Sequence, residues 1–407
     1  MFFNANRYHV LISGICALVL SMGIARYSFT PMIPFMSDQM GVTEGLAGWL
    51  AGWNYIGYLT GLFVVWLVAD LRAKDFFYRY GLIVAVIATA AMAAHEDRLV
   101  WYASRFFAGV TSATGFMLGT GLVLNWLHHN GFRSELGIHF SGIGMGIILS
   151  ALVVDLTGLG GYFDLNWRLQ WVALAGVGML LCLPAFLLLP MPKENEIEMS
   201  RDKDVGIGSE MDPPSARWVW LLSAAYFCAG FSNTLNVTFT SLITELQPLE
   251  GLGAKVWLVV GLVAAPSSFI WDRIARKTTP LDSLIGAFCL NAMGNIILAT
   301  SSSLATTIIA AMLFGFTFIG IVSLTLSTVG RAFGLKATQV MARLTFGYCI
   351  AQILSPILSG YVAEMSGSFK APLYTVTGIM GIGLICLFAT RPEANQRVRQ
   401  RRELAKK

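Results

Sequence analysis

Apolar runs long enough to cross a lipid bilayer recur along almost the whole sequence, and they constrain the fold more than any other feature. A helix needs roughly 20 apolar residues to span the hydrocarbon core. Backbone N–H and C=O groups find no water in lipid, so each run must satisfy them internally as a helix. We therefore predict an all-α polytopic membrane protein. Its twelve predicted transmembrane helices lie at residues 8–36, 46–69, 77–94, 99–127, 136–156, 169–189, 217–242, 253–271, 281–300, 303–328, 340–364 and 373–390.

The composition agrees with a chain in contact with a lipid bilayer and argues against several other classes. Only 13% of the residues are charged and 56% are hydrophobic, whereas soluble domains average about 25% charged residues. The net charge of +5 does not indicate nucleic-acid binding, because the basic residues lie in short loops and the C-terminal tail. The six cysteines lie in apolar runs without metal-ligand or redox spacing. No catalytic motif is present, so we expect no enzyme activity, metal or cofactor.

Basic residues are distributed unequally between the two sets of loops. If both termini lie on one side, that side carries 22 of the 28 Lys and Arg residues and the opposite loops carry four, while Arg26 and Arg105 lie within spans. Loops that stay in the cytoplasm are enriched in Lys and Arg. We therefore predict that both termini are cytoplasmic. The first span is too long for a signal peptide, so we expect it to remain in the mature protein.

One polar segment, residues 191–216, interrupts the apolar pattern near the middle of the chain. It is rich in Glu, Asp, Lys and Gly and lacks apolar periodicity, which is typical of a flexible linker. We predict a six-helix bundle at 1–190, a cytoplasmic linker at 191–216, a second six-helix bundle at 217–390, and a basic cytoplasmic tail at 391–407. A six-plus-six plan is typical of transporters built from two structural repeats.

A short charged motif follows both the second and the eighth predicted helix. An aspartate precedes basic residues in each case, as Asp70 before Arg72 and as Asp272 before Arg273. Ordinary enrichment of cytoplasmic loops in Lys and Arg explains the arginines, but it does not explain an aspartate at the matching place twice. The repetition favours an internal repeat.

These motifs resemble the cytoplasmic loop motif of the major facilitator superfamily, and Arg105 with Gly109 is similar to its Arg-xxx-Gly pattern. Within that superfamily, residues 23–34 (GIARYSFTPMIP), 49–58 (WLAGWNYIGY) and 342–356 (ARLTFGYCIAQILSP) resemble the bacterial YbfB/YjiJ-type transporters. The resemblance implies the two-bundle major facilitator fold, a monomer in the bacterial inner membrane, and gating or structural roles for Asp70, Arg105, Asp272 and Arg273.

Arg26 is an arginine near the middle of the first apolar run. A guanidinium at this depth costs about 2.5–3.5 kcal/mol even on the lenient insertion scale, so it is expected to face protein or a wet cavity. One interpretation is structural, with the cation paired to a helix dipole or a carboxylate. The other is functional, with the cation holding an anionic group of a molecule that crosses the membrane.

Polar side chains form a stripe on each of three other predicted helices. At one-turn spacing such residues share a helix face. They either bond neighbouring helices, at about 0.6 kcal/mol per contact, or line a polar cavity. We take them, with Arg26, as candidate substrate-binding residues. The stripes contain Asn54, Tyr55 and Tyr58 at 46–69, Asn233 and Asn236 at 217–242, and Tyr348 and Gln352 at 340–364.

A lone buried cation suits a small singly charged anion. We therefore predict a secondary active transporter that moves a small organic solute, a monoanion such as a carboxylate, by alternating access. Protons are one candidate coupling ion, but no Asp or Glu lies near the middle of a predicted helix, which leaves rim carboxylates, His139 or the substrate itself to titrate. The alternative is an exporter of hydrophobic compounds, drugs or metabolites, which aromatic residues would favour. These residues are Trp53, Tyr55, Phe314, Phe316 and Phe318.

Overall fold

In the computed structural model, the described residues (6–132, 136–158, 161–192, 214–333 and 337–404) form long helices joined by short turns. The helices of the first half are α1 (Arg7–Leu18), the π-helical turn η1 (Val19–Tyr27), α2 (Phe29–Met40), α3 (Glu44–Leu67), α4 (Leu71–Ala94), α5 (Arg98–His129), α6 (Leu136–Thr157) and α7 (Trp167–Leu187). Those of the second half are α9 (Ala216–Glu245), α10 (Gly253–Lys277), α11 (Pro280–Thr300), α12 (Leu304–Phe333), α13 (Ala337–Ser366) and α14 (Lys370–Leu404).

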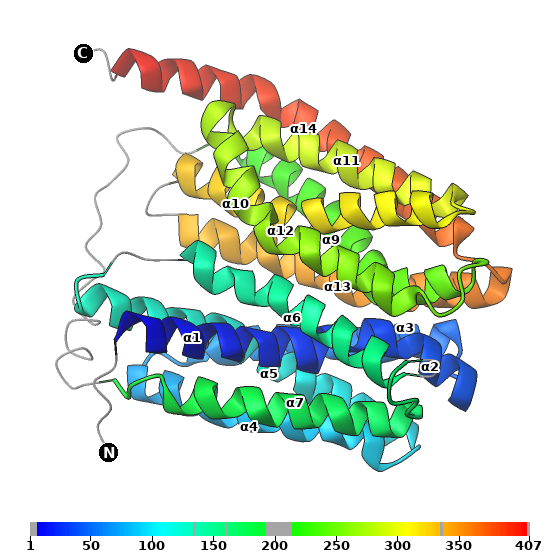
Figure 1. The fold of residues 1–407 in the computed structure, drawn as a ribbon. Helices are drawn as coiled ribbons and strands as arrows, with labels where there is room; N and C mark the ends of the chain where they lie inside the picture. Colours follow the sequence, from blue (N-terminus) through cyan, green and yellow to red (C-terminus); the bar gives the residue numbers. More distant parts are fainter. Residues whose placement is uncertain (1–5, 133–135, 159–160, 193–213, 334–336, 405–407) are drawn as a thin grey trace.

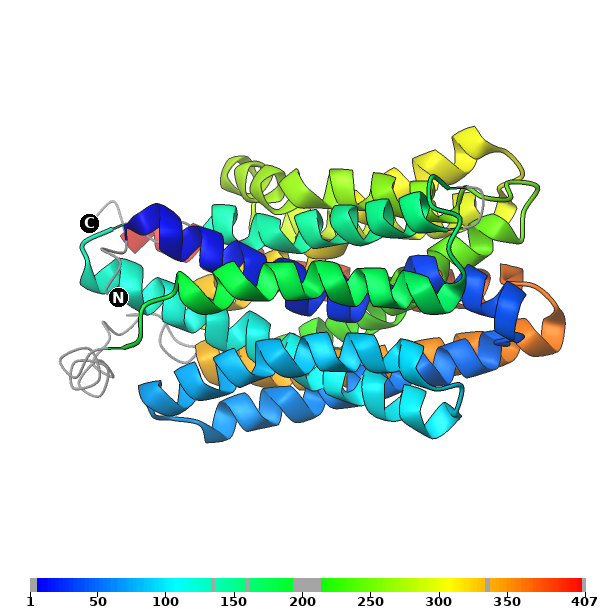
Figure 2. The same ribbon diagram turned by 60° about the horizontal axis from the view of Figure 1, so that its bottom comes forward.

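The lengths and composition of these helices confirm the predicted all-α membrane fold. Eleven segments of the described chain, with α1, η1 and α2 counted as one, are long and apolar enough to cross a membrane. The remaining helix, α9, falls outside this set because Ser, Asn and Thr residues lower its hydropathy. It nevertheless has 30 residues, enough for about 45 Å of helix. Helix α1 begins at the same end of the molecule at which helix α14 ends (Figure 1, Figure 2). An even number of membrane crossings requires this.

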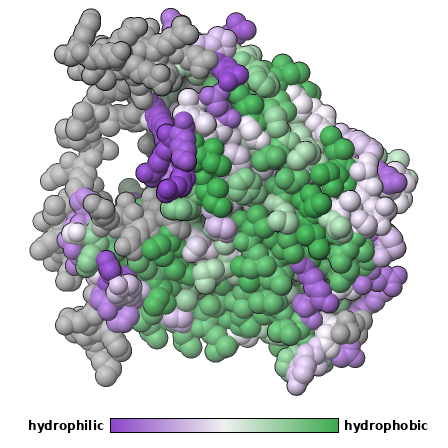
Figure 3. Space-filling model, turned by 45° about the horizontal axis from the view of Figure 1, so that its top comes forward, coloured by the Kyte–Doolittle hydropathy of each residue, from purple (hydrophilic) through white to green (hydrophobic). Residues whose placement is uncertain are grey.

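The outer surface has the polarity of a membrane protein. Figure 3 shows a broad apolar face over the sides of the helices, with hydrophilic residues gathered toward the two ends. Large apolar side chains are exposed on the surface of the protein, among them Trp66, Leu180, Trp220 and Ile385. Such an apolar face would be unfavourable in water, and a lipid environment removes that cost.

The helices of the two halves lie on opposite sides of the molecule (Figure 1). Helix α3 packs on α13, α6 packs on α10, and α2 packs on α9. The first pair approaches closely at Gly48, where an added Cβ would lie 2.3 Å from the carbonyl oxygen of Pro356. At the end opposite the termini, the Gly45 N–H also donates to the Glu364 carboxylate over 2.9 Å.

Two predicted boundaries compare differently with the structure. The separation of 281–300 from 303–328 is confirmed, because α11 and α12 are distinct helices. The last predicted helix is too short, because α14 continues past residue 390 into the segment predicted as a tail. Two contacts hold this continuation: Arg391 pairs with Asp282 at 2.9 Å, and Glu393 accepts hydrogen bonds from the N-cap Ser215 of α9. Most of the predicted linker, 193–213, lies outside the described residues.

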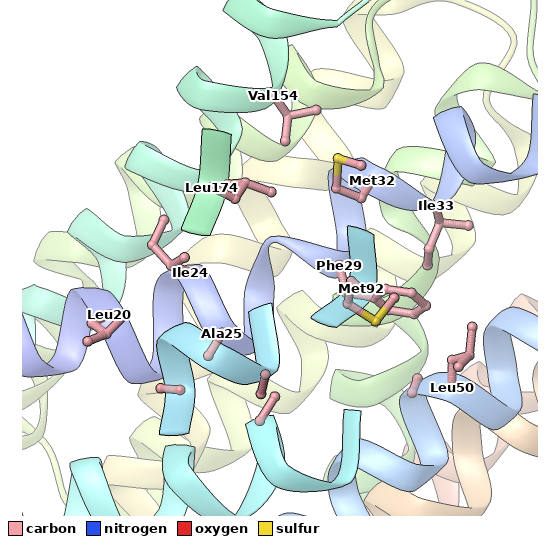
Figure 4. Packing of buried hydrophobic residues seen from close by; sticks show 14 of the residues in the cluster. Leu20, Ile24, Ala25, Phe29, Met32, Ile33, Leu50, Met92, Val154 and Leu174 are labelled. Atoms are coloured by element: carbon pink, nitrogen blue, oxygen red, sulfur yellow. The ribbon is translucent and has the colours of Figure 1, made fainter. Parts of the chain in front are cut away.

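The bent first segment, α1–η1–α2, runs through the core of the first half. Figure 4 shows it changing direction between Ile24 and Met32, with its apolar side chains surrounded by residues from four other helices. Those neighbours are Leu50 of α3, Met92 of α4, Val154 of α6 and Leu174 of α7. Because the segment is enclosed on these sides, its residues are fixed relative to every neighbouring helix.

The contact between η1 and α6 leaves no space for a side chain at Gly23. A Cβ there would lie 2.3 Å from the Gly146 Cα atom. We predict that Gly23→Ala lowers the melting temperature of the purified protein, since forcing a methyl group into a packed contact costs about 1–3 kcal/mol. The matched control is Gly176→Ala, where an added Cβ meets no atom within 4 Å. An equal change in the two variants would contradict the close contact.

Candidate functional site

The central feature of the site is a π-helical turn that carries Arg26. In η1 the Ser28 N–H bonds to the carbonyl of Gly23, five residues back, over 2.9 Å. Pro31 follows shortly after and has no N–H to donate to the preceding turn. The α-helical bonding pattern is therefore broken at Arg26. Turns of this type occur frequently at functional sites.

Three tyrosine rings surround the Arg26 guanidinium, which is 5% exposed. Its Cζ atom lies 4.3 Å from the ring centroid of Tyr58, 4.5 Å from that of Tyr55 and 5.5 Å from that of Tyr27. Each ring offers a cation–π contact, worth about 0.5–2 kcal/mol depending on desolvation. Arg26, Tyr55 and Tyr58, three of the candidates from the sequence, thus lie together.

Arg26 has no acidic partner among the described residues. The ion pairs found there join other groups: Asp75 with Arg79, Glu96 with Arg168, Asp155 with Lys255, Asp272 with Arg276, and Asp282 with Arg391. The Nε and Nη1 atoms of Arg26 are also buried without a hydrogen-bond partner in this part of the chain. The site therefore holds one cation whose charge and two of whose nitrogen atoms remain available.

Arg105 of α5 is also buried, but its guanidinium is bound to the backbone. Its Nη1 donates to the carbonyl of Ala25 over 3.0 Å and its Nη2 to the carbonyl of Arg26 over 3.2 Å. Its Cζ lies 4.5 Å from the Phe29 ring centroid. Arg105 thus caps carbonyl groups at the bend between η1 and α2. Asn54 belongs to the same arrangement, because its amide donates to the carbonyl of Arg105 over 3.0 Å.

Tyr348, on α13 of the second half, lies near Arg26. Tyr348 is close enough to interact electrostatically with Arg26 and Tyr55. Its hydroxyl accepts a hydrogen bond from the Asn233 amide over 3.2 Å, and its ring stacks on Tyr226 with the centroids 4.3 Å apart. Gln352 lies one turn along α13, 6% exposed, and it forms no hydrogen bond within the described residues.

Asn236 points to a different group of residues. Its amide donates to the carbonyl of Ser232 over 2.9 Å and to Oδ1 of Asn295 over 2.7 Å. The first bond lies within α9 and the second joins α9 to α11. Asn236 makes no contact with Arg26 among the described residues, and its role in substrate binding remains a prediction. Asn291 and Asn295 complete this group and were not among the sequence candidates. The signal was present, since two amides one turn apart stand out in the apolar run 281–300.

Aromatic side chains pack together next to Arg26, on the side that faces the end opposite the termini. The Tyr27 ring makes edge contacts with Phe318 at 6.0 Å and Trp257 at 6.5 Å, both from the second half. One turn further along, the Thr30 hydroxyl donates to the carbonyl of Val237 in α9. Tyr27 and Trp257 were missed in the sequence, because neither stands out in an apolar run rich in aromatic residues.

A cleft of about 990 Å³ opens beyond these aromatic side chains. Residues from the ends of α2, α6, α9 and α10 line it, and Arg26 is not among them. Four carboxylates face it with one ammonium group, namely Asp38, Asp155, Glu245, Glu250 and Lys255. Arg26 is thus not part of the cleft, whose charged groups are mostly carboxylates.

Three of the residues with predicted gating or structural roles lie at the end of the molecule that carries the termini, namely Asp70, Asp272 and Arg273. Asp70 is the N-cap of α4 and accepts from the Ala73 N–H over 3.0 Å, whereas Asp272 lies inside α10 and pairs with Arg276 at 2.6 Å. Arg273 is exposed. The two aspartates therefore occupy different local structures, and their gating roles remain predictions.

Arg79 is a further buried arginine of the first half. It lies in α4, 6% exposed, and pairs with Asp75 at 2.8 Å. Its remaining nitrogen atoms donate to the carbonyls of Phe186 and Leu189. It thereby caps the carbonyl groups at the end of α7, close to the start of the predicted linker.

Comparisons with known proteins agree with the fold. Residues 18–388 match the family model described as "Uncharacterised MFS-type transporter YbfB". The chain is 22% identical over 416 residues to the "Probable sulfoacetate transporter SauU" of Cupriavidus necator, with 94% of each chain covered. It is 21% identical to the "Uncharacterized MFS-type transporter YceJ" of Bacillus subtilis, with 83% and 87% covered. The crystal structure of the nucleoside transporter NupG is similar in fold, with a TM-score of 0.73, 13% identity, and coverage of 94% and 98%.

Substitutions of Arg26 and of Arg105 should have different effects on the thermal stability of the protein. We predict that Arg105→Gln lowers the melting temperature, because its two bonds to backbone carbonyls are each worth about 1.5–3 kcal/mol. Arg26→Gln should leave the melting temperature unchanged or raise it, because it removes an unpaired buried charge. Thermal unfolding of both purified variants checks this. A large loss of stability in Arg26→Gln would show that Arg26 is a structural residue.

Proposed function

Because the chain belongs to the YbfB-type family of transporters in the major facilitator superfamily, we propose that it carries a small organic anion and that Arg26 binds the anion's charge. The observation that carries this proposal is the unpaired guanidinium of Arg26, which is 5% exposed and enclosed by Tyr27, Tyr55 and Tyr58. A cation is costly at this depth. A bound anion would offset that cost, and the free Nε and Nη1 atoms would donate to its oxygen atoms.

We propose a monoanion, such as a carboxylate, as the substrate. Arg105 is buried nearby, but its guanidinium donates to two backbone carbonyls and packs on Phe29. One guanidinium is therefore left for the ligand. The relative whose name specifies sulfoacetate supports the anionic class but not the single charge, since sulfoacetate is a dianion with one carboxylate and one sulfonate.

The alternative of an exporter for hydrophobic compounds has weaker support from the packing. Of the aromatic residues that favoured it, Trp53 contacts Tyr102 and Phe106 inside the first half. Phe316 stacks against Trp271 inside the second half. Trp53 and Phe316 thus pack inside their own halves, whereas Tyr55 lies beside Arg26 and Phe318 contacts Tyr27.

Alternating access and cytoplasmic termini are the remaining parts of the proposal. The contacts of Tyr27 with Trp257 and Phe318 separate Arg26 from one end of the molecule, which supports a site that opens to one side at a time. The basic residues at the other end support a cytoplasmic location for it. For coupling to protons we propose the substrate carboxylate or His139, which is buried and bonded to Thr120.

Arg26→Gln is the test of the anion site. We expect it to abolish uptake of the transported anion into proteoliposomes, and Arg26→Lys to weaken uptake strongly, because Lys lacks the planar fork that fits a carboxylate. Arg168→Gln is the matched control, since this arginine is exposed and pairs with Glu96. Full uptake by Arg26→Gln would remove Arg26 from the substrate site.

A thermal-shift screen of the purified protein identifies the anion to be used. Acetate, propionate, sulfoacetate, nucleosides and hydrophobic amines form the panel. A ligand that binds only the native state stabilises it by about 2.7 kcal/mol at 100 times its Kd. Carboxylates or sulfoacetate should raise the melting temperature of the wild-type protein and not of Arg26→Gln. A response to hydrophobic amines alone would favour the exporter.

A further inference from the structure

A chain of hydrogen bonds crosses the second half and ends at Tyr348. It joins side chains of α9, α11, α12 and α13, all of them buried. Each amide oxygen can only accept and each amide nitrogen can only donate, whereas the hydroxyls of Ser232 and Thr317 can do both. The direction of each bond is therefore given by its donor and acceptor atoms in the structure. The members are Asn236, Asn295, Ser232, Asn291, Thr317, Asn233 and Tyr348.

The backbone carbonyl of Ser232 fixes the direction at one end of the chain. A carbonyl accepts only, so the atom of Asn236 that bonds to it at 2.9 Å must be the amide nitrogen. The same nitrogen donates to Asn295 over 2.7 Å, which makes the atom of Asn295 facing it the oxygen. The nitrogen of Asn295 then donates to the Ser232 hydroxyl over 2.8 Å.

The middle of the chain continues in the same direction. The Ser232 hydroxyl accepts from Asn295 and donates its own proton to Oδ1 of Asn291 over 2.7 Å. The nitrogen of Asn291 donates to Thr317 over 3.0 Å and to Oδ1 of Asn233 over 3.4 Å. Thr317 agrees with this direction, because its proton is already donated to the carbonyl of Leu313.

The last bond leaves the Tyr348 proton without a partner. With its oxygen bonded to Asn291, Asn233 turns its nitrogen toward Tyr348 and donates to the Tyr348 oxygen over 3.2 Å. The phenol oxygen therefore accepts within the chain, and its single proton has no hydrogen-bond acceptor among the described residues. The side chain is 6% exposed and interacts electrostatically with Arg26, while stacking on Tyr226 holds its ring in place.

We propose that Tyr348 donates its phenolic proton to the anion that Arg26 binds, so that one anion bridges the two halves of the transporter. The inference rests on the proposed function and adds a second contact to it, from the opposite half. Asn233, Asn291, Asn295 and Ser232 are positioning residues, because they keep the Tyr348 oxygen an acceptor toward α9 and leave its proton for the ligand. A ligand group facing Tyr348 must then be an acceptor, which a carboxylate or sulfonate oxygen supplies.

Tyr348→Phe tests the proposed contact, since it removes one hydroxyl and keeps the ring. The Kd of acetate, propionate or sulfoacetate, whichever stabilises the wild-type protein most, should rise about 10- to 100-fold, as for a hydrogen bond to a charged group. Tyr226→Phe is the matched control, because this ring belongs to the same stack and its hydroxyl lies outside the chain. Its Kd should stay within about twofold of wild type.

A double-mutant cycle tests the positioning role. Asn291→Leu should raise the same Kd about 10-fold in the wild-type background, because Asn233 is then free to turn its oxygen toward Tyr348 and take the proton. In the Tyr348→Phe background it should change the Kd by less than twofold, since no proton remains to be directed. Equal losses in both backgrounds would reduce Asn291 to a packing residue and overturn its positioning role.

The outcomes separate this inference from the proposed function. If Arg26→Gln abolishes anion binding while Tyr348→Phe matches wild type, the bridge is wrong and the anion site stands. If Arg26→Gln binds the anion as wild type does, or if no anion of the panel binds to the wild-type protein, both proposals fail.

Discussion

The structure depends on burying the Arg26 guanidinium in a low-dielectric interior without a carboxylate beside it. Several features of the first half reduce that cost. Aromatic faces from η1 and α3 surround the cation, and the π-helical turn places it where α3 can reach it. A second arginine, Arg105, fixes the backbone that carries Arg26, because its guanidinium donates to the carbonyls of Ala25 and Arg26. Arg105 thus fixes the local backbone, whereas Arg26 supplies the unpaired charge.

The second half faces this cation with neutral amides and hydroxyls. Every member of that group is bonded to another, as a buried polar network requires if it is to be stable. The contacts of Tyr348 with Asn233 and Tyr226 therefore define its orientation before any ligand binds. The two halves are therefore chemically unequal, one providing charge and the other providing directed hydrogen bonds. Binding that needs both would be sensitive to their relative position, which is the property that alternating access uses.

Much of the fold followed from the apolar runs, while the site followed only in part. Lipid allows the backbone few choices, so helix number and order were predictable, and even the short break between α11 and α12 was found. The ends of the helices were less predictable. The last part of α14 is polar, so no apolar run marks it in the sequence, and it is held by contacts that involve Asp282 and Glu393. Arg26 stood out since charge is rare in such a run. Asn236, Asn291 and Asn295 could not be sorted into packing and binding roles, because partner choice depends on which helices are neighbours.

The acidic cleft at the end opposite the termini has a consequence for how fast an anion can pass through it. Four carboxylates and one ammonium group give it a negative potential, and at physiological salt such a potential extends about 8 Å into solution. An anion that crosses this mouth meets the same electrostatic barrier whether it enters or leaves. Passage of negatively charged cargo through the cleft would therefore become faster in both directions as salt is added, because salt screens the carboxylates.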